Sequence, residues 1–324
     1  MRHNRSLYSS SQVNTRKCTI SERLNYTEKM CQAWSKTYKP SKASHRNIFV
    51  DHKHKLLLCV PYKTAFSTHM HLLAVNSDAV LYNKFPKDSL ERMLKSLSMK
   101  ATHKKFGIYN LNSNSMFPVK SRKRLLKEYY KVMVVRHPFV RLVSMYFNKV
   151  ARYNTDTHLW NCSAKSYGTR MSSWLRKNHP SRIGNCSFNM FVSYFLNNTE
   201  IFRKDMHTHP QHSWCNHCDI HYDFIERLET GYSDQEYLLK NIINPNFTGT
   251  VHKNKDFSRN LIHGDVFERV LPQFQDISDA QLKELAQFYG ADLALFGYEF
   301  ERAEPKGQVR TRCKIDIRGG HYCC

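Results

Sequence analysis

Two segments of the chain show the same succession of a short apolar run, a polar loop and an amphipathic stretch. In the first, Leu56 to Val60 is apolar, Pro61 ends the run, and Ser67 to Val75 has helical spacing. In the second, the run Lys131 to Val135 is broken by His137-Pro138, and apolar residues then recur at helical spacing as far as Arg152. Each segment therefore predicts a buried strand, a loop and a helix.

Two strand-loop-helix units in succession predict parallel strands joined by right-handed crossovers. A parallel sheet of this kind is covered by helices on both faces. The sequence thus predicts an α/β fold with a central parallel sheet flanked by helices.

Other segments add helices and one more strand to this fold. Residues 221–229 resemble a strand, and helices are expected at 88–97, 121–130, 187–197 and 233–242, with a short helical suggestion at 20–34. Ser278 and Gln281 form a capping box, Leu282 and Leu285 supply a buried face, and Gly290 suits a left-handed helix end. The last helix is the clearest prediction.

Composition divides the chain into three parts. Residues 1–45 are polar, basic and rich in Ser, Thr and Asn, as in a stem or linker. Residues 46–300 carry the predicted sheet and form one domain, and residues 301–324 are a basic tail that contains cysteines.

The charge balance favours an anionic partner. Lys and Arg number 50 against 27 Asp and Glu, a formal net charge of +23. Nucleic acid, anionic lipid and acidic polysaccharide all meet this condition.

Cysteines and glycosylation sequons favour a lumenal, oxidising compartment over the cytosol. The chain has 10 Cys, and Asn-x-Ser/Thr triplets begin at Asn4, Asn25, Asn161, Asn185, Asn197 and Asn246. No segment is apolar enough for a membrane span or a signal peptide. If the protein is lumenal, its targeting segment and anchor lie outside this chain; a cytosolic protein would explain the absence equally well.

Candidate chemistry lies where the two predicted strands end. In a parallel sheet, ligands bind at the carboxyl ends of the strands, where helix N-termini attract anions. The first loop offers Lys63 with hydroxyls at Thr64, Ser67 and Thr68, and the second offers Arg136, followed by Arg141 and Ser144 on the next helix. For either cation alone, a solvated loop charge is the alternative interpretation. Together they predict two anion sites, as a nucleotide with phosphates at both ends would require.

Four motifs in this order resemble the Golgi carbohydrate sulfotransferases of the chondroitin and dermatan 4-O-sulfotransferase type. LLLCVPYKTAFSTHMHLL resembles their 5′-phosphosulfate loop, VVRHPFVRLVSMYFNK their 3′-phosphate motif, WCNHCDIHYDFIERLET their Cys-x-x-Cys segment and LFGYEF their closing motif. Two features depart from the family pattern: Tyr62 separates Pro61 from Lys63, and Phe66-Ser67-Thr68-His69 replaces Cys-Thr-Asn-Trp.

The resemblance implies a sulfotransferase fold, whose sheet is similar to that of P-loop NTPases. It implies that 3′-phosphoadenosine 5′-phosphosulfate is the donor and that no metal takes part. By position in the motifs, the donor site is Lys63, Thr64, Ala65, Phe66, Ser67, Thr68, Arg136, Pro138, Arg141 and Ser144. Lys63 would stabilise the leaving group, while Arg136 and Ser144 would hold the 3′-phosphate. The implied acceptor is an anionic or neutral glycan, and the implied location is the Golgi lumen, as a type II membrane protein or a truncated or secreted form.

A base is needed to accept the proton of the acceptor hydroxyl, and histidine suits this role near neutral pH. His207 stands eight residues before Cys215, where the resemblance implies the base. His209 and His212 are rivals, and a packing role is the alternative for each.

The Cys-x-x-Cys segment has two interpretations. Cys215 and Cys218 could bind zinc with His212, His217 or His221, but a second ligand pair at finger spacing is absent from the sequence. A structural disulfide, between these two cysteines or with other partners, is favoured. Cys162 and Cys186 are a further candidate pair, and Cys313, Cys323 and Cys324 cannot be assigned.

Two other functions compete with sulfuryl transfer. A non-enzymatic protein that binds heparin-like chains or nucleic acid would need the basic residues, but the sequence lacks a nucleic-acid recognition signature. A nucleotide kinase is disfavoured because Lys63 is not part of a Walker motif. Nucleic acid is therefore not the expected partner.

Overall fold

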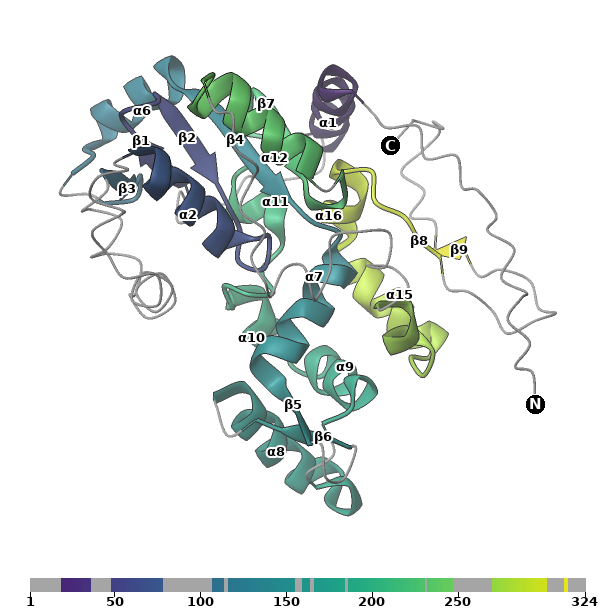
Figure 1. Ribbon diagram of the computed structural model, residues 1–324. Helices are drawn as coiled ribbons and strands as arrows, with labels where there is room; N and C mark the ends of the chain where they lie inside the picture. The colour runs from purple at the N-terminus through teal and green to yellow at the C-terminus, as the bar shows by residue number, and fades with distance from the viewer. Residues whose placement is uncertain are drawn as a thin grey trace, which may run out of the picture.

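The computed structural model describes ten ranges of the chain: 19–35, 48–77, 107–113, 116–154, 159–163, 166–183, 186–230, 232–246, 270–301 and 312–313. A five-stranded sheet in the order β3-β1-β2-β4-β7 lies at the centre (Figure 1). Its strands are β1 (Ile48–Asp51), β2 (Leu56–Cys59), β3 (Ile108–Asn110), β4 (Tyr130–Val135) and β7 (Phe224–Arg227).

The three strands that the sequence predicted are parallel neighbours. Leu56 is paired with Tyr130, and Val132 is paired with Phe224. The sheet also contains antiparallel pairs, because β1 runs antiparallel to both β2 and β3. The tight turn between Asp51 and Leu56 returns the chain as a hairpin, which only antiparallel strands allow.

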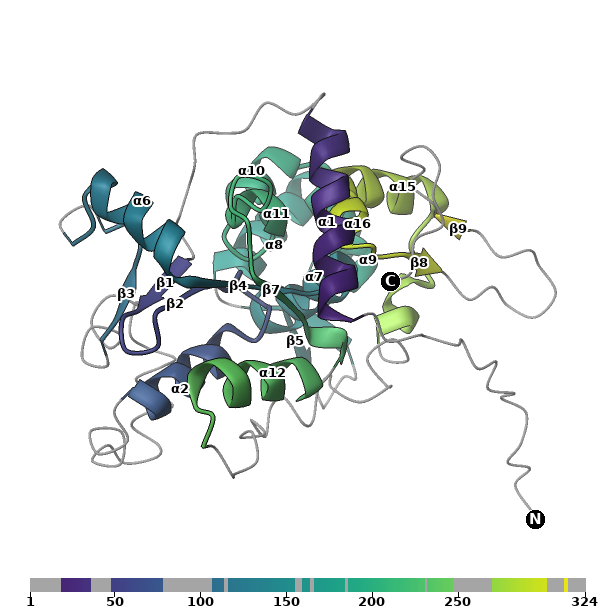
Figure 2. The same ribbon diagram turned by 90° about the horizontal axis from the view of Figure 1, so that it is seen from above.

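The sheet separates two apolar layers, as the prediction of two covered faces required. Alternate strand residues divide between them, so that Leu57 and Met133 belong to one layer and Leu58 and Val132 to the other. Figure 2 shows α2 (Phe66–Ser77) and α12 (Tyr232–Leu238) on one face and α1 (Ile20–Ser35) and α16 (Gly290–Leu295) on the opposite face.

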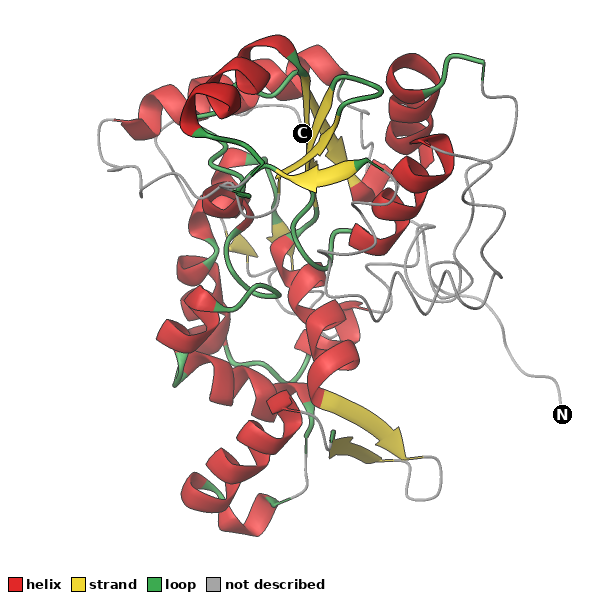
Figure 3. Cartoon of the chain, turned by 90° about the vertical axis from the view of Figure 1, so that its left-hand side faces the viewer, coloured by secondary structure: helices red, strands yellow, loops and turns green. Residues whose placement is uncertain are grey.

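Helices follow β2 and β4 where the apolar spacing predicted them. They are α2 and α7 (Pro138–Met145), and α7 continues as a π-helical turn over Tyr146–Val150. The predicted continuation to Arg152 was wrong, because Ala151 adopts extended dihedrals (φ −100°, ψ 152°) and begins β5. β5 (Ala151–Asn154) pairs with β6 (Leu159–Cys162) in a ribbon beside α8 (Ser166–Asn178) (Figure 3).

Most other predicted elements are confirmed. The stretch 121–130 forms α6 (Val119–Glu128) and the start of β4, 187–197 forms α9 (Phe188–Leu196), and 233–242 forms α12 with a π-helical turn (Leu239–Ile243). The helix expected at 88–97 lies outside the described residues. The remaining elements are η2 (Pro180–Arg182), α10 (Thr199–Lys204), α11 (Gln211–Trp214), η3 (Leu228–Thr230), η5 (Leu271–Phe274), α15 (Asp279–Phe288), β8 (Phe300–Glu301) and β9 (Arg312–Cys313).

The capping box of the last long helix is confirmed, whereas its predicted end is not. The Ser278 hydroxyl accepts from the Gln281 N–H at 3.2 Å, and the Gln281 side chain accepts from the Ser278 N–H at 3.1 Å. Gly290 does not provide a left-handed end. The chain turns at Tyr289 (φ −102°) directly into α16, and Gly290 is the first residue of that helix.

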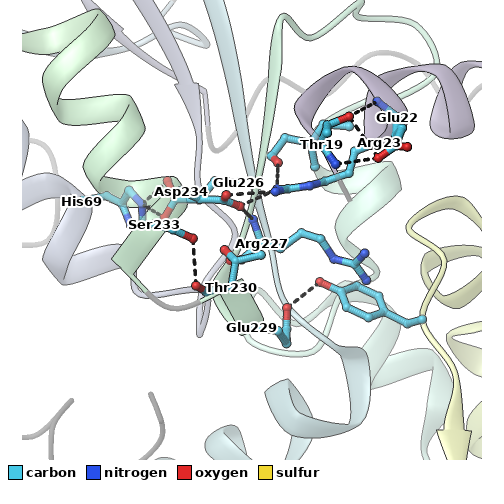
Figure 4. A network of polar contacts seen from close by, with 12 residues as sticks. Thr19, Glu22, Arg23, His69, Glu226, Arg227, Glu229, Thr230, Ser233 and Asp234 are labelled. Carbon is cyan, nitrogen blue, oxygen red and sulfur yellow. Dashed lines mark hydrogen bonds and ion pairs between the residues drawn. The ribbon is translucent and has the colours of Figure 1, made fainter. Parts of the chain in front are cut away.

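Within the range 1–45, α1 is a docked helix and does not extend as a linker. Arg23 lies in a polar network with Asp234 and the end of β7 (Figure 4). The Arg23 Nη2 donates to Asp234 Oδ1 at 2.9 Å, its Nη1 donates to the Ile225 carbonyl at 2.9 Å, and Cys31 is bonded to Cys218. No helix in the described ranges is long and apolar enough to cross a bilayer.

Candidate active site at the ends of β2 and β4

The two cationic loops lie at one edge of the sheet, as the parallel strands require. Cys59 at the end of β2 is paired with Met133, two residues before the end of β4. The loop 60–65 and the turn at Arg136 therefore leave the sheet side by side. Both lead directly into helices, α2 and α7.

Arg136 and Arg141 hold the loop 60–65 through its carbonyl groups. The Arg136 Nη1 donates to the Lys63 carbonyl at 2.9 Å, and the Arg141 Nε donates to the Tyr62 carbonyl at 2.9 Å. The structure thus brings Lys63, Arg136 and Arg141 together, although they come from two separate segments of the sequence.

Positive charge accumulates at this edge. Burial, reinforced by the charges of Arg136, Lys149 and Arg141, lowers the pKa of Lys63 to about 7. Burial also lowers the pKa of Arg136 to about 10, against the opposing effect of Glu229. Arg136 remains charged at neutral pH, so an anion at this edge would relieve the repulsion between the cations.

Arg141 supplies a second indication of an anionic ligand. Its side chain is 1% exposed, and its Nη1 has no hydrogen-bond partner in the described part of the chain. A buried guanidinium nitrogen without a partner carries a large desolvation cost. A phosphate that accepts from Arg141 would remove that cost, so the residues present fit a phosphorylated ligand.

The other predicted donor-site residues occupy two helix starts. Pro138 is the first residue of α7, and Ser144 lies one turn after Arg141 and is half-buried. Ser67 is exposed in the first turn of α2, and Thr68 beside it is half-buried. These positions leave both helix N-termini at the cationic edge.

Thr64 and Phe66 have internal contacts instead of facing outward. The buried Thr64 hydroxyl donates to the Pro61 carbonyl at 2.5 Å. The Phe66 ring stacks on Tyr62, with 5.1 Å between the ring centroids. Both residues therefore stabilise the turn, and the Thr64 hydroxyl is bonded within the loop.

The loop is held in a strained backbone conformation. Lys63 (φ 71°) and Ala65 (φ 57°) both lie in the left-handed region. Non-glycine residues there cost on the order of 1–3 kcal/mol each and persist where the surroundings fix them, often at functional sites.

His207 lies next to this loop with one ring nitrogen directed at a carboxylate. Its ring is 5.2 Å from that of Tyr62, and its Nδ1 is 3.3 Å from Asp205 Oδ1 and 3.2 Å from the Tyr167 hydroxyl. Burial raises the pKa of Asp205, but hydrogen bonds from His207 and Tyr167 outweigh it and lower the pKa below its usual value. An ionised Asp205 favours the proton on Nδ1, which leaves Nε2 as an acceptor.

The rival histidines have other partners. The His209 Nε2 contacts the Ser213 hydroxyl at 2.9 Å, and its Nδ1 contacts the Arg203 carbonyl. The His212 Nδ1 lies 2.8 Å from Asp292, whose side chain is 0% exposed. These contacts fix both rings as parts of the packing around α11.

The Cys-x-x-Cys pair forms disulfides, but with distant partners. Cys215 is bonded to Cys59 and Cys218 to Cys31, so a bond between Cys215 and Cys218 was the wrong pairing. The predicted Cys162–Cys186 bond is confirmed. Sulfurs in disulfides cannot act as zinc ligands, which rules out the zinc site built on Cys215 and Cys218.

Several residues of this site were missed from the sequence. Asp205 and Tyr167 orient His207, Lys149 adds to the positive charge, and Gln211 binds the backbone of Arg136 at the mouth of β4. Only Asp205 had a usable signal, since it stands two residues before His207. The others come from segments whose proximity depends on the fold.

Comparisons with known proteins agree with this geometry. Residues 46–299 match the profile described as the Sulfotransferase family. Carbohydrate sulfotransferase 11 of Rattus norvegicus is 29% identical over 260 residues, which cover 78% of this chain and 67% of that protein.

Two further relatives have related names. Carbohydrate sulfotransferase 14 of Danio rerio is 27% identical, with 82% of this chain and 65% of the relative covered. Carbohydrate sulfotransferase 12 of Xenopus laevis is 26% identical, with coverages of 78% and 60%. The match thus spans about two thirds of each relative or somewhat less. No solved structure gave a significant match.

Proposed function

The chain belongs to the sulfotransferase family, and on that premise we propose that it transfers a sulfuryl group from 3′-phosphoadenosine 5′-phosphosulfate to a sugar hydroxyl. The convergence of Lys63, Arg136 and Arg141 at one edge of the sheet carries this proposal. It suits a nucleotide with phosphate groups at both ends, which AMP and ATP are not.

Lys63 is the residue that would stabilise the leaving group. In sulfuryl transfer, the acceptor oxygen bonds to sulfur while the bond from sulfur to the 5′-phosphate oxygen breaks. Negative charge builds on that oxygen, and a preorganised cation beside it lowers the barrier. In the free protein, the positive charges of Arg136, Arg141 and Lys149 disfavour the ammonium form of Lys63. The negative charge of the bound donor offsets this repulsion.

The 3′-phosphate would be bound by Arg136, Arg141 and Ser144. Arg136 uses Nη1 for the Lys63 carbonyl, which leaves its remaining N–H groups for an anion. Arg141 Nη1 has no partner in the described ranges, and Ser144 lies one turn further on the same helix. A guanidinium with a hydroxyl forms a phosphate site that distinguishes this donor from ATP.

His207 is the proposed base. Asp205 holds Nδ1, so Nε2 can accept the proton of the sugar hydroxyl as its oxygen attacks sulfur. Tyr62 precedes Lys63 in the loop 60–65, and its ring is 5.2 Å from the His207 ring. The proposed base therefore lies beside the loop that carries the cation for the leaving group.

The acceptor and location that we propose rest on the family resemblance. The acceptor is the 4-hydroxyl of N-acetylgalactosamine in chondroitin, dermatan or a glycoprotein glycan, and the net charge of +23 suits an acidic chain. The Golgi lumen is the proposed compartment, with attachment through an N-terminal anchor. The three disulfides within the described ranges support an oxidising compartment.

Ligand-induced thermal stabilisation tests the donor assignment, because a ligand of the native state raises apparent stability. We expect adenosine 3′,5′-bisphosphate to stabilise the protein more than AMP or ATP, and this preference should vanish in Arg136→Ala. Equal responses to the three nucleotides would refute the assignment. Transfer of labelled sulfate to desulfated chondroitin, dermatan and a glycoprotein glycan then identifies the acceptor.

A further inference from the structure

A buried ion pair joins the helix after the donor loop to the outer strand of the sheet. His69, on α2, is 0% exposed, and its Nε2 lies 2.9 and 3.0 Å from the two carboxylate oxygens of Glu226 on β7 (Figure 4). Glu226 alternates with Phe224 and so faces the same apolar layer, between the sheet and α2. Buried ion pairs add little net stability, so this pair calls for another explanation.

The second ring nitrogen of His69 points back to the donor loop. Its Nδ1 donates to the Ala65 carbonyl at 3.0 Å, and the same carbonyl accepts from the backbone N–H groups of Thr68 and His69. Both ring nitrogens therefore face acceptors, as in an imidazolium beside a carboxylate. Ala65 (φ 57°) is one of the two strained residues of the loop, and this contact fixes its carbonyl.

Three cationic side chains thus hold three carbonyls of the loop. Arg141 holds Tyr62, Arg136 holds Lys63, and His69 holds Ala65. The two arginines hold the loop but also repel the ammonium of Lys63. His69 holds the loop from its other end, and Glu226 in turn holds His69.

The strand that carries Glu226 also reaches the second cationic turn. Glu226 is paired with Val134, two residues before Arg136, and Glu229 accepts from the His137 N–H at 2.6 Å. The contact between His69 and β7 therefore fixes the position of the Lys63 loop relative to the turn that carries Arg136.

We propose that His69 and Glu226 are a positioning pair, which holds the loop in its binding conformation before the nucleotide arrives. The proposal rests on the donor assignment above and extends it. The pair contacts neither the reacting atoms nor the ligand; it acts through the Ala65 carbonyl. Preorganisation of this kind strengthens binding because ordering of the loop is no longer needed when the ligand binds.

A double substitution separates positioning from stability. In His69→Leu/Glu226→Leu, apolar side chains of similar volume replace the ion pair, a change that cores commonly tolerate. We expect the melting temperature to stay within a few degrees or rise, while the Kd for adenosine 3′,5′-bisphosphate, measured by calorimetry, increases on the order of tenfold or more. KM for the donor should rise with it. Unchanged Kd and KM in the folded double variant would overturn the proposal.

The single variant Glu226→Gln serves if the double variant does not fold. Its amide oxygen still accepts from His69 Nε2, so the Kd should increase less than in Glu226→Leu. An equal increase in Kd in Glu226→Gln and Glu226→Leu would contradict the proposal, because the proposal requires the retained hydrogen bond to preserve part of the affinity.

The His54–Asp51 pair provides a matched control. It is another histidine–carboxylate pair, part-buried, with 2.6 Å between His54 Nδ1 and Asp51 Oδ2, in the turn before β2 at the other end of that strand. Asp51→Asn should lower the melting temperature and leave the Kd unchanged; a Kd that rises as much as in the double variant would show a general loss of structure and would overturn the proposal. Failure of the wild-type protein to prefer the bisphosphate would instead refute the donor assignment.

Discussion

The side-chain amide of Gln211 forms two hydrogen bonds with the backbone of Arg136. Its Oε1 accepts from the Arg136 N–H at 2.9 Å, and its Nε2 donates to the Arg136 carbonyl at 2.7 Å. Gln211 is 0% exposed and its own N–H donates to Asp292 at 2.7 Å. The turn that carries the proposed phosphate-binding arginine is therefore fixed by a residue on the segment that carries His207.

Gln211→Leu tests this link. The substitution leaves the N–H and carbonyl of Arg136 buried without partners, which should reduce the free energy of unfolding by about 2 kcal/mol or more. KM for the donor should rise because Arg136 loses its position. Urea denaturation and initial rates measure the two effects. Gln281→Ala, which removes the capping-box glutamine of α15, is the control and should leave KM unchanged.

Nucleotide binding should depend on pH through Lys63. Its pKa is lowered to about 7 in the free protein, so a growing fraction of the ammonium is lost as pH rises from 6 to 8. A bound anion favours the charged form, so affinity for adenosine 3′,5′-bisphosphate should fall over this range and binding at pH 8 should take up protons. Calorimetry in buffers of different ionisation enthalpy measures the uptake. The result to be expected for Lys63→Met is weak binding with this pH dependence removed.

His207→Ala should greatly reduce the rate of the chemical step and leave the Kd for the donor unchanged. Loss of a general base commonly costs about 10²–10⁴-fold in kcat. Asp205→Asn should cause a smaller loss, because it removes only the group that orients the Nδ1 proton. His209→Gln is the matched comparison, since both ring nitrogens of His209 have structural partners. A fully active His207→Ala enzyme would remove the base assignment.

Ser278→Ala should affect stability alone. The hydroxyl of Ser278 caps α15 by accepting from the Gln281 N–H, and loss of such a cap costs about 1 kcal/mol. Ser278 is far in sequence from Lys63 and Arg136, and its side chain bonds only within the capping box among the described contacts. We therefore expect kcat and KM to stay unchanged. Thermal denaturation with parallel rate measurements checks both expectations.

The parallel core of the fold was predictable because its signal is local. The apolar runs at β2 and β4 and the helices that follow them are visible in single stretches of sequence. The antiparallel β1 escaped prediction because Ile48–Asp51 is followed by a hairpin turn and not by a helix, so it lacks the strand-loop-helix pattern. The docked position of α1 escaped for another reason: the Asp234 that binds Arg23 is separated from it by 211 residues.

The same distinction applies to the site. Lys63 and Arg136 were identifiable because each ends a recognisable strand, and the structure places them in contact. The roles of His69 and Gln211 depend on partners 157 and 75 residues away, which no spacing rule connects. Both residues support the cations through the backbone, and such support leaves no motif in a sequence.

The disulfide connectivity has a consequence for biosynthesis. Cys31 and Cys59 precede their partners by 187 and 156 residues, and both partners lie within 215–218. A nascent chain therefore carries both thiols without their native partners until the ribosome has added that segment. A premature bond between Cys31 and Cys59 would have to be exchanged by a thiol before α1 and β2 could reach their native positions, so folding from such a species would depend on thiol–disulfide exchange.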